Sequence, residues 1–91
     1  MKYAYYALFS KDDGVWSYSF KEVGGFGVGD DLDDTRAMAK EAIRLNVQWL
    51  IEDGEAIPEP TPREVIEAEA ENDPDYTEWF VELVEAEVSL S

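Results

Sequence analysis

The 91-residue sequence contains no cysteine and no histidine. Without cysteine, disulfide bonds, thiolate catalysis and cysteine-ligated metals are excluded. Without histidine, the chain also lacks the commonest general base and the commonest metal ligand.

Basic residues are scarce as well. Lys and Arg number 7 against 22 Asp and Glu, which gives a net charge of −15. Binding to nucleic acid or to an anionic membrane surface is unfavourable for such a chain unless it carries a local basic patch. A basic protein partner fits the charge better. The charge is equally compatible with a surface that only keeps a small domain in solution.

Long apolar runs are missing too. No stretch reaches the roughly 18 apolar residues of a membrane span, and the first ten residues, "MKYAYYALFS", lack the cleavage site of a signal peptide. We therefore expect a cytoplasmic protein. Its length predicts one domain over residues 1–91, and so small a domain favours association, for example as a homo-oligomer.

Three strands are predicted in the first third of the chain. "KYAYYALF", from Lys2 to Phe9, is apolar on both faces, so both faces need cover. "SKDDG" predicts a turn over Ser10 to Gly14. "VWSYSF" alternates, with Trp16, Tyr18 and Phe20 on one face. "FGVG" is a short third strand whose glycines indicate either a bulge or close backbone approach.

A long helix, a short helix and a final strand should follow. Asp31 is the expected N-cap of the long helix, with Asp30 as an alternative, and Gly54 its stop. Thr61, Pro62 and Glu64 predict the start of a short helix that ends near Glu71. The expected sheet-facing stripe of the long helix consists of Leu32, Met38, Ala39, Ala42, Ile43, Leu45, Trp49 and Leu50.

The last segment, "TEWFVELVEAEVSL", is rich in strand formers. Val84, Ala86, Val88 and Leu90 share one face, while Glu85, Glu87 and Ser89 share the other. The predicted fold is therefore α+β, with the order βββαβ, a mostly antiparallel sheet, one long helix and a short extra helix before the last strand. The right-handed crossover rule predicts that the last strand runs parallel to the first.

The stretch "GGFGVGDDLDD", from Gly24 to Asp34, has the outline of a phosphate-binding loop before a helix. However, Asp30 occupies the last glycine position of the dinucleotide motif, and no lysine follows the last glycine. Four aspartates would also repel a phosphate at this helix N-terminus. We therefore expect a turn, a short strand and a helix cap, with no dedicated metal or cofactor site.

Two charged sets have alternative explanations. Arg36, Lys40 and Arg44 on the long helix could bind an anion, but pairing with neighbours such as Glu41 and Asp33 is favoured. The last-strand glutamates either form a solvated face or meet a basic partner and steer its approach. These glutamates are Glu78, Glu82, Glu85 and Glu87.

Three features in order along the chain carry a resemblance to a known family. They are the hairpin "DDGVWSYSF", the segment "GGFGVGDDLDDTRAMAKEAI" with small residues at Ala39 and Ala42, and the proline-bearing "EDGEAIPEP". Together they resemble the HicB-like antitoxins over about residues 2 to 60. The resemblance implies a partial ribonuclease H-like fold and a non-enzymatic protein. It also implies a partner, a small HicA-type toxin that cleaves mRNA.

Some family features are not matched. Many members carry a C-terminal DNA-binding domain, which we do not expect within these 91 residues, and Lys21 and Phe26 stand where the family often has proline and cysteine. Ribonuclease H-like nucleases need carboxylates on central strands, and Lys2 to Ser10 has none, so no nuclease activity is expected.

Two functions are therefore compared. The first is an antitoxin that covers the active or RNA-binding surface of a basic toxin, using Trp16, Tyr18 and Trp79 as exposed anchors beside the four last-strand glutamates. The second is a solitary homo-oligomeric regulatory or scaffold domain, in which a copy of the chain covers the second face of the first strand.

Overall fold

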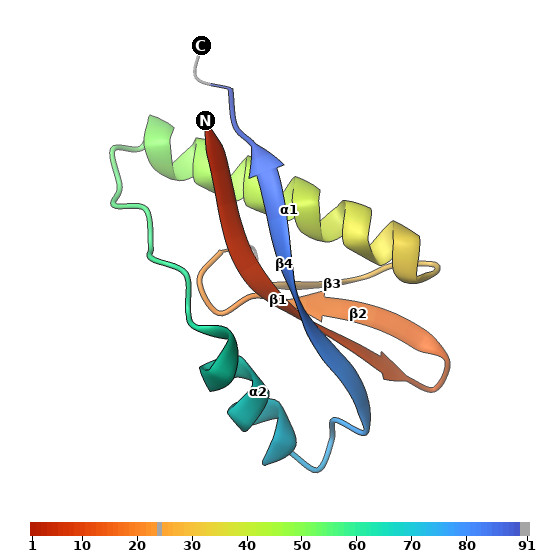
Figure 1. The fold of residues 1–91 in the computed structure, drawn as a ribbon. Helices are drawn as coiled ribbons and strands as arrows, with labels where there is room; N and C mark the ends of the chain where they lie inside the picture. The colour runs from red at the N-terminus through yellow and green to blue at the C-terminus, as the bar shows by residue number, and fades with distance from the viewer. Residues whose placement is uncertain (24, 90–91) are drawn as a thin grey trace.

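The computed structural model describes residues 1–23 and 25–89, which form a four-stranded sheet with a helix on each face (Figure 1). The strands lie in the order β3-β2-β1-β4. This architecture confirms the predicted α+β fold and the order βββαβ with a short helix before the last strand. The elements are β1 (Lys2–Asp12), β2 (Val15–Ser19), β3 (Phe26–Val28), α1 (Leu32–Glu52), α2 (Arg63–Glu71) and β4 (Glu78–Glu87).

The predicted direction of the last strand is wrong, because β4 runs antiparallel to β1. The segment between the helices explains the difference. It holds Pro58, Pro60 and Pro62, which favour extended backbone, and it carries the chain along the sheet to the far end of β1 (Figure 1). Helix α2 follows there, so β4 starts at the end of the sheet where β1 finishes and returns beside the start of β1.

A two-residue turn joins β1 and β2. Asp12 pairs with Val15, and Asp13 and Gly14 between them have φ of 53° and 79°. Positive φ at both positions suits the twist of a hairpin and is tolerated by Asp and Gly. The turn is therefore shorter than the predicted Ser10 to Gly14, because Ser10, Lys11 and Asp12 continue the ladder.

Helix α1 covers one face of the sheet. It buries Thr35, Ala39, Ile43 and Val47 against a core that includes Tyr5, Ala7 and Phe9 of β1. The predicted stripe is wrong at Leu45 and Trp49, which are 52% and 64% exposed. Leu45 lies two positions from both Ile43 and Val47, roughly 200° around the helix, so it faces away from the sheet.

Helix α2 covers part of the opposite face. Its Ile66 and Ala70 form a second small core with Leu8 of β1 and Val81 of β4. The prediction that β1 needs cover on both faces is confirmed, and the chain supplies the second layer itself. The predicted cap of α2 is wrong by one position, because Pro62 is the N-cap and makes no side-chain cap hydrogen bond. The backbone N–H of Thr61 is instead bonded by the Glu22 carboxylate.

Alternation along β4 follows the prediction where the chain is described. Val84, Ala86 and Val88 are buried on the α1 side, while Glu85, Glu87 and Ser89 are exposed. Gly24 and Leu90, which the sequence placed in the glycine-rich turn and on the apolar face of the last strand, lie outside the described residues.

Candidate functional site

The four glutamates predicted to meet a partner all lie on β4, the last strand of the sheet order. They do not share one face, because successive side chains of a strand alternate. Glu82 points to the α1 side, where Arg36 binds it with N–O distances of 2.9 and 3.3 Å. Glu85 lies on the opposite side with Val81, which packs against α2.

The same glutamates differ in how far the chain neutralises them. Glu82 pairs with Arg36, Glu78 lies 3.9 Å from the Lys11 amine, and Glu87 lies 3.2 Å from the amino group of Met1. Glu85 is exposed and has no ion pair among the described residues. Of the four, Glu85 is therefore the carboxylate whose charge is most available to a cation of another molecule.

The three predicted aromatic anchors fall on both sides of the sheet. Trp16 packs edge-on against Phe80 at a ring distance of 5.6 Å and is only half-buried. Trp79 lies on the other side, against the α2 core. The expectation of an exposed ring at Tyr18 is wrong, because Tyr18 is 6% exposed. Its burial beneath α1 also raises the pKa of its hydroxyl.

Several apolar side chains are more exposed than the predicted anchors. Leu83 of β4 is 42% exposed, and Phe26 of β3 is 77% exposed. Leu83 could have been found from the sequence, because the first half of the last strand, "WFVELV" from Trp79 to Val84, has apolar residues on both faces. The exposure of Phe26 could not have been predicted from the sequence, because a strand of three residues is too short to show an alternating pattern.

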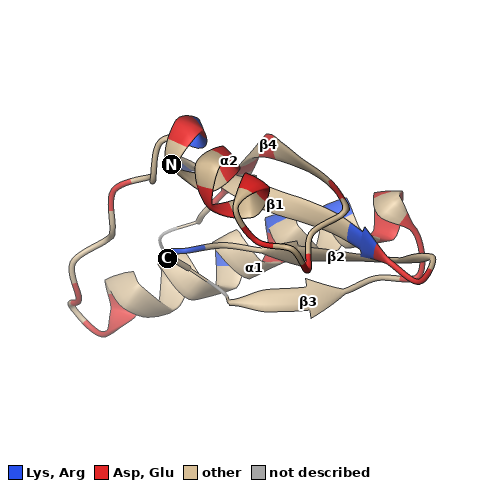
Figure 2. Ribbon diagram, turned by 90° about the horizontal axis from the view of Figure 1, so that it is seen from below, with Lys and Arg blue, Asp and Glu red and all other residues tan. Residues whose placement is uncertain are grey.

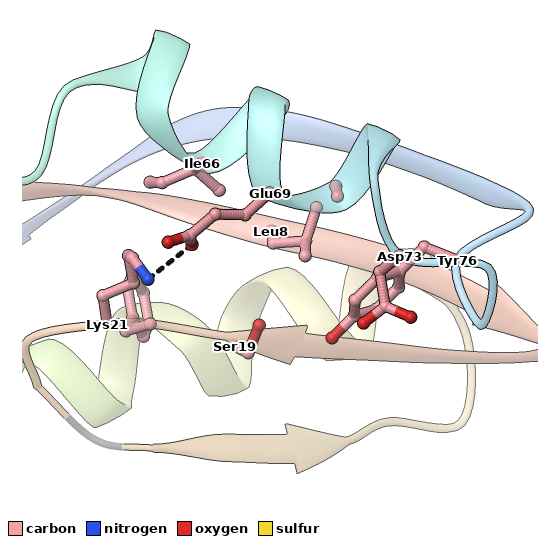
Figure 3. Close-up of a pocket in the computed structure, with 9 residues that line it drawn as sticks. Leu8, Ser19, Lys21, Ile66, Glu69, Asp73 and Tyr76 are labelled. Carbon is pink, nitrogen blue, oxygen red and sulfur yellow. Dashed lines mark ion pairs between the residues drawn. The ribbon is translucent and has the colours of Figure 1, made fainter.

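A cleft lies between α2 and the sheet, with a volume of about 250 Å³. Figure 3 shows Leu8 and Ile66 in it, with Lys21 and Glu69 joined across its mouth by an ion pair of 2.5 Å. Ser19, Asp73 and Tyr76 also line a neighbouring groove that reaches Phe26. The cleft has apolar residues such as Leu8 and Ile66 at its floor and charged residues at its rim.

Acidic residues are spread over the helices, the strands and the connecting segments, whereas basic residues are few (Figure 2). The sequence has 22 acidic residues, all of them within the described part of the chain. Ion pairs of the described residues involve only Asp33, Glu41, Glu69, Glu78, Glu82 and Glu87. Most carboxylates are therefore neutralised only by solvent ions, and a basic protein can replace those ions.

The described part of the glycine and aspartate stretch, residues 25–34, forms a turn, the short strand β3 and a helix cap, as predicted. Asp31 Oδ1 accepts a hydrogen bond from the Asp34 N–H at 2.7 Å, and Asp34 Oδ2 accepts one from the Asp30 N–H at 2.9 Å. A Cβ at Gly27 would lie 2.6 Å from the Tyr18 ring, which confirms the predicted close backbone approach. Among the described residues, no group of three or more His, Cys, Asp or Glu is placed to hold a metal ion.

The basic row of α1 is largely paired with acidic neighbours. Arg36 contacts Asp33 and Glu82, and Arg44 binds Glu41 with an Nε–Oε2 distance of 3.0 Å. The hydrogen bond from Arg44 lowers the pKa of Glu41. The prediction that ion pairs occupy this row is confirmed for both arginines. Within the described residues, no helix is long and apolar enough to cross a membrane.

Three comparisons relate this chain to known proteins. A chain of a solved structure, the toxin–antitoxin complex from Streptococcus pneumoniae, matches with a TM-score of 0.75 over 96% of this chain and 70% of that chain. The two sequences are 21% identical, so this likeness establishes the fold. A curated relative is the uncharacterized 14.9 kDa protein in the rep-hol intergenic region of Haemophilus phage HP1 (strain HP1c1).

That relative is 32% identical over 66 residues, which is 72% of this chain and 47% of the relative. The chain therefore spans about half the length of the curated relative it matches. The family model described as the HicB_like antitoxin of bacterial toxin-antitoxin systems matches residues 5–91. The chain belongs to this family of antitoxins, which confirms the resemblance found in the sequence.

Proposed function

We propose that this chain binds and neutralises a small basic mRNA-cleaving toxin of the HicA type by covering its active or RNA-binding surface. The observation that carries the proposal is the excess of 22 carboxylates over 7 cations, with few of them paired internally. A toxin that binds RNA must present basic groups to phosphates, and an acidic surface competes for those groups. Membership of an antitoxin family supports the same conclusion.

The proposed mechanism needs no catalytic residue in this chain. Carboxylates such as Glu85 steer the basic toxin into contact, and exposed apolar side chains such as Leu83 and the partly buried Trp79 become desolvated anchors. The roles of Trp16, Tyr18, Trp79, Glu78, Glu82, Glu85 and Glu87 in contacting the partner stay predictions. The burial of Tyr18 and the pairing of Glu82 make these two the weakest members of the set.

Co-expression with the toxin tests the proposal. The proposed toxin is first sought as a short basic reading frame beside this gene. It is then expressed alone and with the tagged chain, and cell growth and co-purification are measured. We expect growth arrest by the toxin alone, rescue by the chain, and a one-to-one complex whose association slows as salt is added. Rescue without any complex would contradict neutralisation by direct binding.

A nuclease assay tests the proposed lack of enzymatic activity. The purified chain is incubated with RNA and Mg²⁺, and the RNA should remain intact. Cleavage that is abolished by substituting aspartates of this chain would contradict the proposal.

The second candidate function is a homo-oligomeric scaffold or regulatory domain. This function was first suggested by the need to cover the second face of β1. Helix α2 already covers that face, so a second copy of the chain is not needed for it. A different observation keeps it open, since Leu45 and Trp49 form an exposed apolar pair on α1. If this pair mediates self-association, Trp49→Lys should convert oligomers to monomers in sedimentation experiments, while toxin binding at another surface persists.

A further inference from the structure

β4 is an edge strand ten residues long, Glu78–Glu87, that pairs with β1 on one side. On its other side, no strand of the described chain is paired with it. Every residue of a strand has one backbone donor and one backbone acceptor. Half of these groups bond to β1, so the other half form a row along the open edge that another strand can use.

The hydrogen bonds show which residues contribute to this open row. Val88 N donates to Met1 O at 2.8 Å, and Met1 N donates to Val88 O at 3.0 Å, so these two residues form a hydrogen-bonded pair. The register continues without interruption from Lys2↔Glu87 to Lys11↔Glu78. Because hydrogen-bonded pairs alternate in an antiparallel ladder, the residues whose backbone groups point away from β1 are Trp79, Val81, Leu83, Glu85 and Glu87.

Arg63 supports this assignment independently. Its Nη2 donates to Val81 O at 3.2 Å from helix α2, so this carbonyl faces away from β1. The same hydrogen bond engages the outward carbonyl of Val81, so this group is not free for an added strand. The open part of the edge therefore runs from Leu83 to Glu87, and it offers the N–H and C=O groups of three residues.

The side chains along this open part combine an apolar anchor with negative charge. Leu83 is 42% exposed, and Glu85 and Glu87 are exposed beside it. Glu82 is held by Arg36 on the other side of the sheet. An incoming strand would therefore meet a row of backbone hydrogen-bonding groups, one apolar side chain and two carboxylates.

Charge decides between the two occupants that could supply such a strand. A second copy of β4 would bring its own glutamates against Glu85 and Glu87, and like charges across a strand pair are destabilising. A strand with lysine or arginine beside these carboxylates would be stabilised by the same geometry. We propose that Leu83–Glu87 receives a strand of the basic toxin and extends the sheet by strand addition, an inference that rests on the proposed function.

Proline at position 85 provides a direct test. Glu85→Pro removes an N–H that points to the open edge and leaves the β1 ladder intact, and proline is tolerated on such edges. Glu85→Ala is the matched control, since it removes the same carboxylate and keeps the N–H. We expect Glu85→Ala to weaken toxin binding by less than about fivefold and Glu85→Pro to weaken it by a further tenfold or so.

The outcomes separate this inference from the proposed function. If the wild-type chain binds the toxin and the two variants bind it equally, strand addition is wrong and neutralisation by binding stands. If the wild-type chain binds no toxin, both are wrong. Amide hydrogen exchange of the wild-type complex gives a second measurement that needs no folded proline variant. The amides of Leu83, Glu85 and Glu87 should become protected, and continued fast exchange would overturn the proposal.

Discussion

Gly29 lies directly against Thr35 at the start of α1, and a Cβ built on Gly29 would stand 2.4 Å from Thr35 Oγ1 and 2.6 Å from its backbone nitrogen. Thr35 is fully buried and cannot move aside. Gly29→Ala should therefore displace the first turn of α1 and lower the free energy of unfolding by about 1–3 kcal/mol. Urea denaturation measures this, with the half-exposed Val28→Ala as the control. Equal stability of the two variants would show that α1 can shift at little cost.

The cap at Asp31 should contribute measurably to stability. Its carboxylate accepts the Asp34 N–H at 2.7 Å, and alanine would leave that donor without its side-chain partner. Asp31→Ala should lower the free energy of unfolding by about 1 kcal/mol. Asp33→Ala is the control, since its carboxylate makes only a long ion pair of 3.7 Å with Arg36. Thermal unfolding followed by circular dichroism should show the larger loss for Asp31→Ala.

Two neighbouring residues of α2 should respond very differently to the same change. Ile66 is buried in the second core, whereas Val65 is 43% exposed. Ile66→Ala should cost about 2–4 kcal/mol through lost burial and the cavity it leaves. Val65→Ala should be neutral or slightly stabilising, because alanine is the better helix former. If both variants unfold like the wild type, α2 does not hold to the sheet as described.

Tyrosine ionisation should destabilise the fold at alkaline pH. Burial raises the pKa of both Tyr5 and Tyr18 above the ordinary value of 10.0, and Glu22 adds to the effect at Tyr5. Above pH 10.0 the unfolded chain therefore loses these protons before the folded chain does, so the folded state binds more protons and stability falls as pH rises.

The free energy of unfolding should be flat with respect to these groups below pH 10 and decrease above it. Tyr18→Phe should make the decrease shallower, and absorbance of tyrosinate should show late titration of the buried rings. If the free energy of unfolding of Tyr18→Phe decreases with rising pH as steeply as that of the wild type, ionisation of Tyr18 does not cause the alkaline destabilisation.

Local features were predictable because they depend on a few adjacent residues. The Asp31 cap, the hairpin and the alternation of Val84, Ala86 and Val88 all follow from side-chain chemistry or from a period of two residues. The direction of β4 was not predictable in this way. It depends on how far the proline-bearing segment travels before α2 begins, which no periodicity encodes.

The sequence predicted which residues of the candidate site are charged or aromatic, but it did not predict where they lie relative to one another. The sequence identified β4 as an acidic strand, but alternation alone cannot tell an edge strand from a central one. Alternation also cannot show that Arg36 forms an ion pair with Glu82 or that Tyr18 is buried. A broad helical stripe includes Leu45 and Trp49, whereas the buried row of α1 is Thr35, Ala39, Ile43 and Val47, flanked by partly buried residues such as Met38 and Ala42.

Because the first strand, β1, pairs with the last strand, β4, the sheet can be completed only after nearly the whole domain has been synthesised. Residues emerge from the ribosome at about 5–20 per second, so β1 waits several seconds for β4, and its pairing edge and aromatic side chains stay without their final cover. The strand that completes the sheet is also the one with the open edge. A nascent chain therefore acquires its proposed docking edge only when synthesis has passed Glu87, so the proposed neutralisation would begin only at the end of this domain's translation.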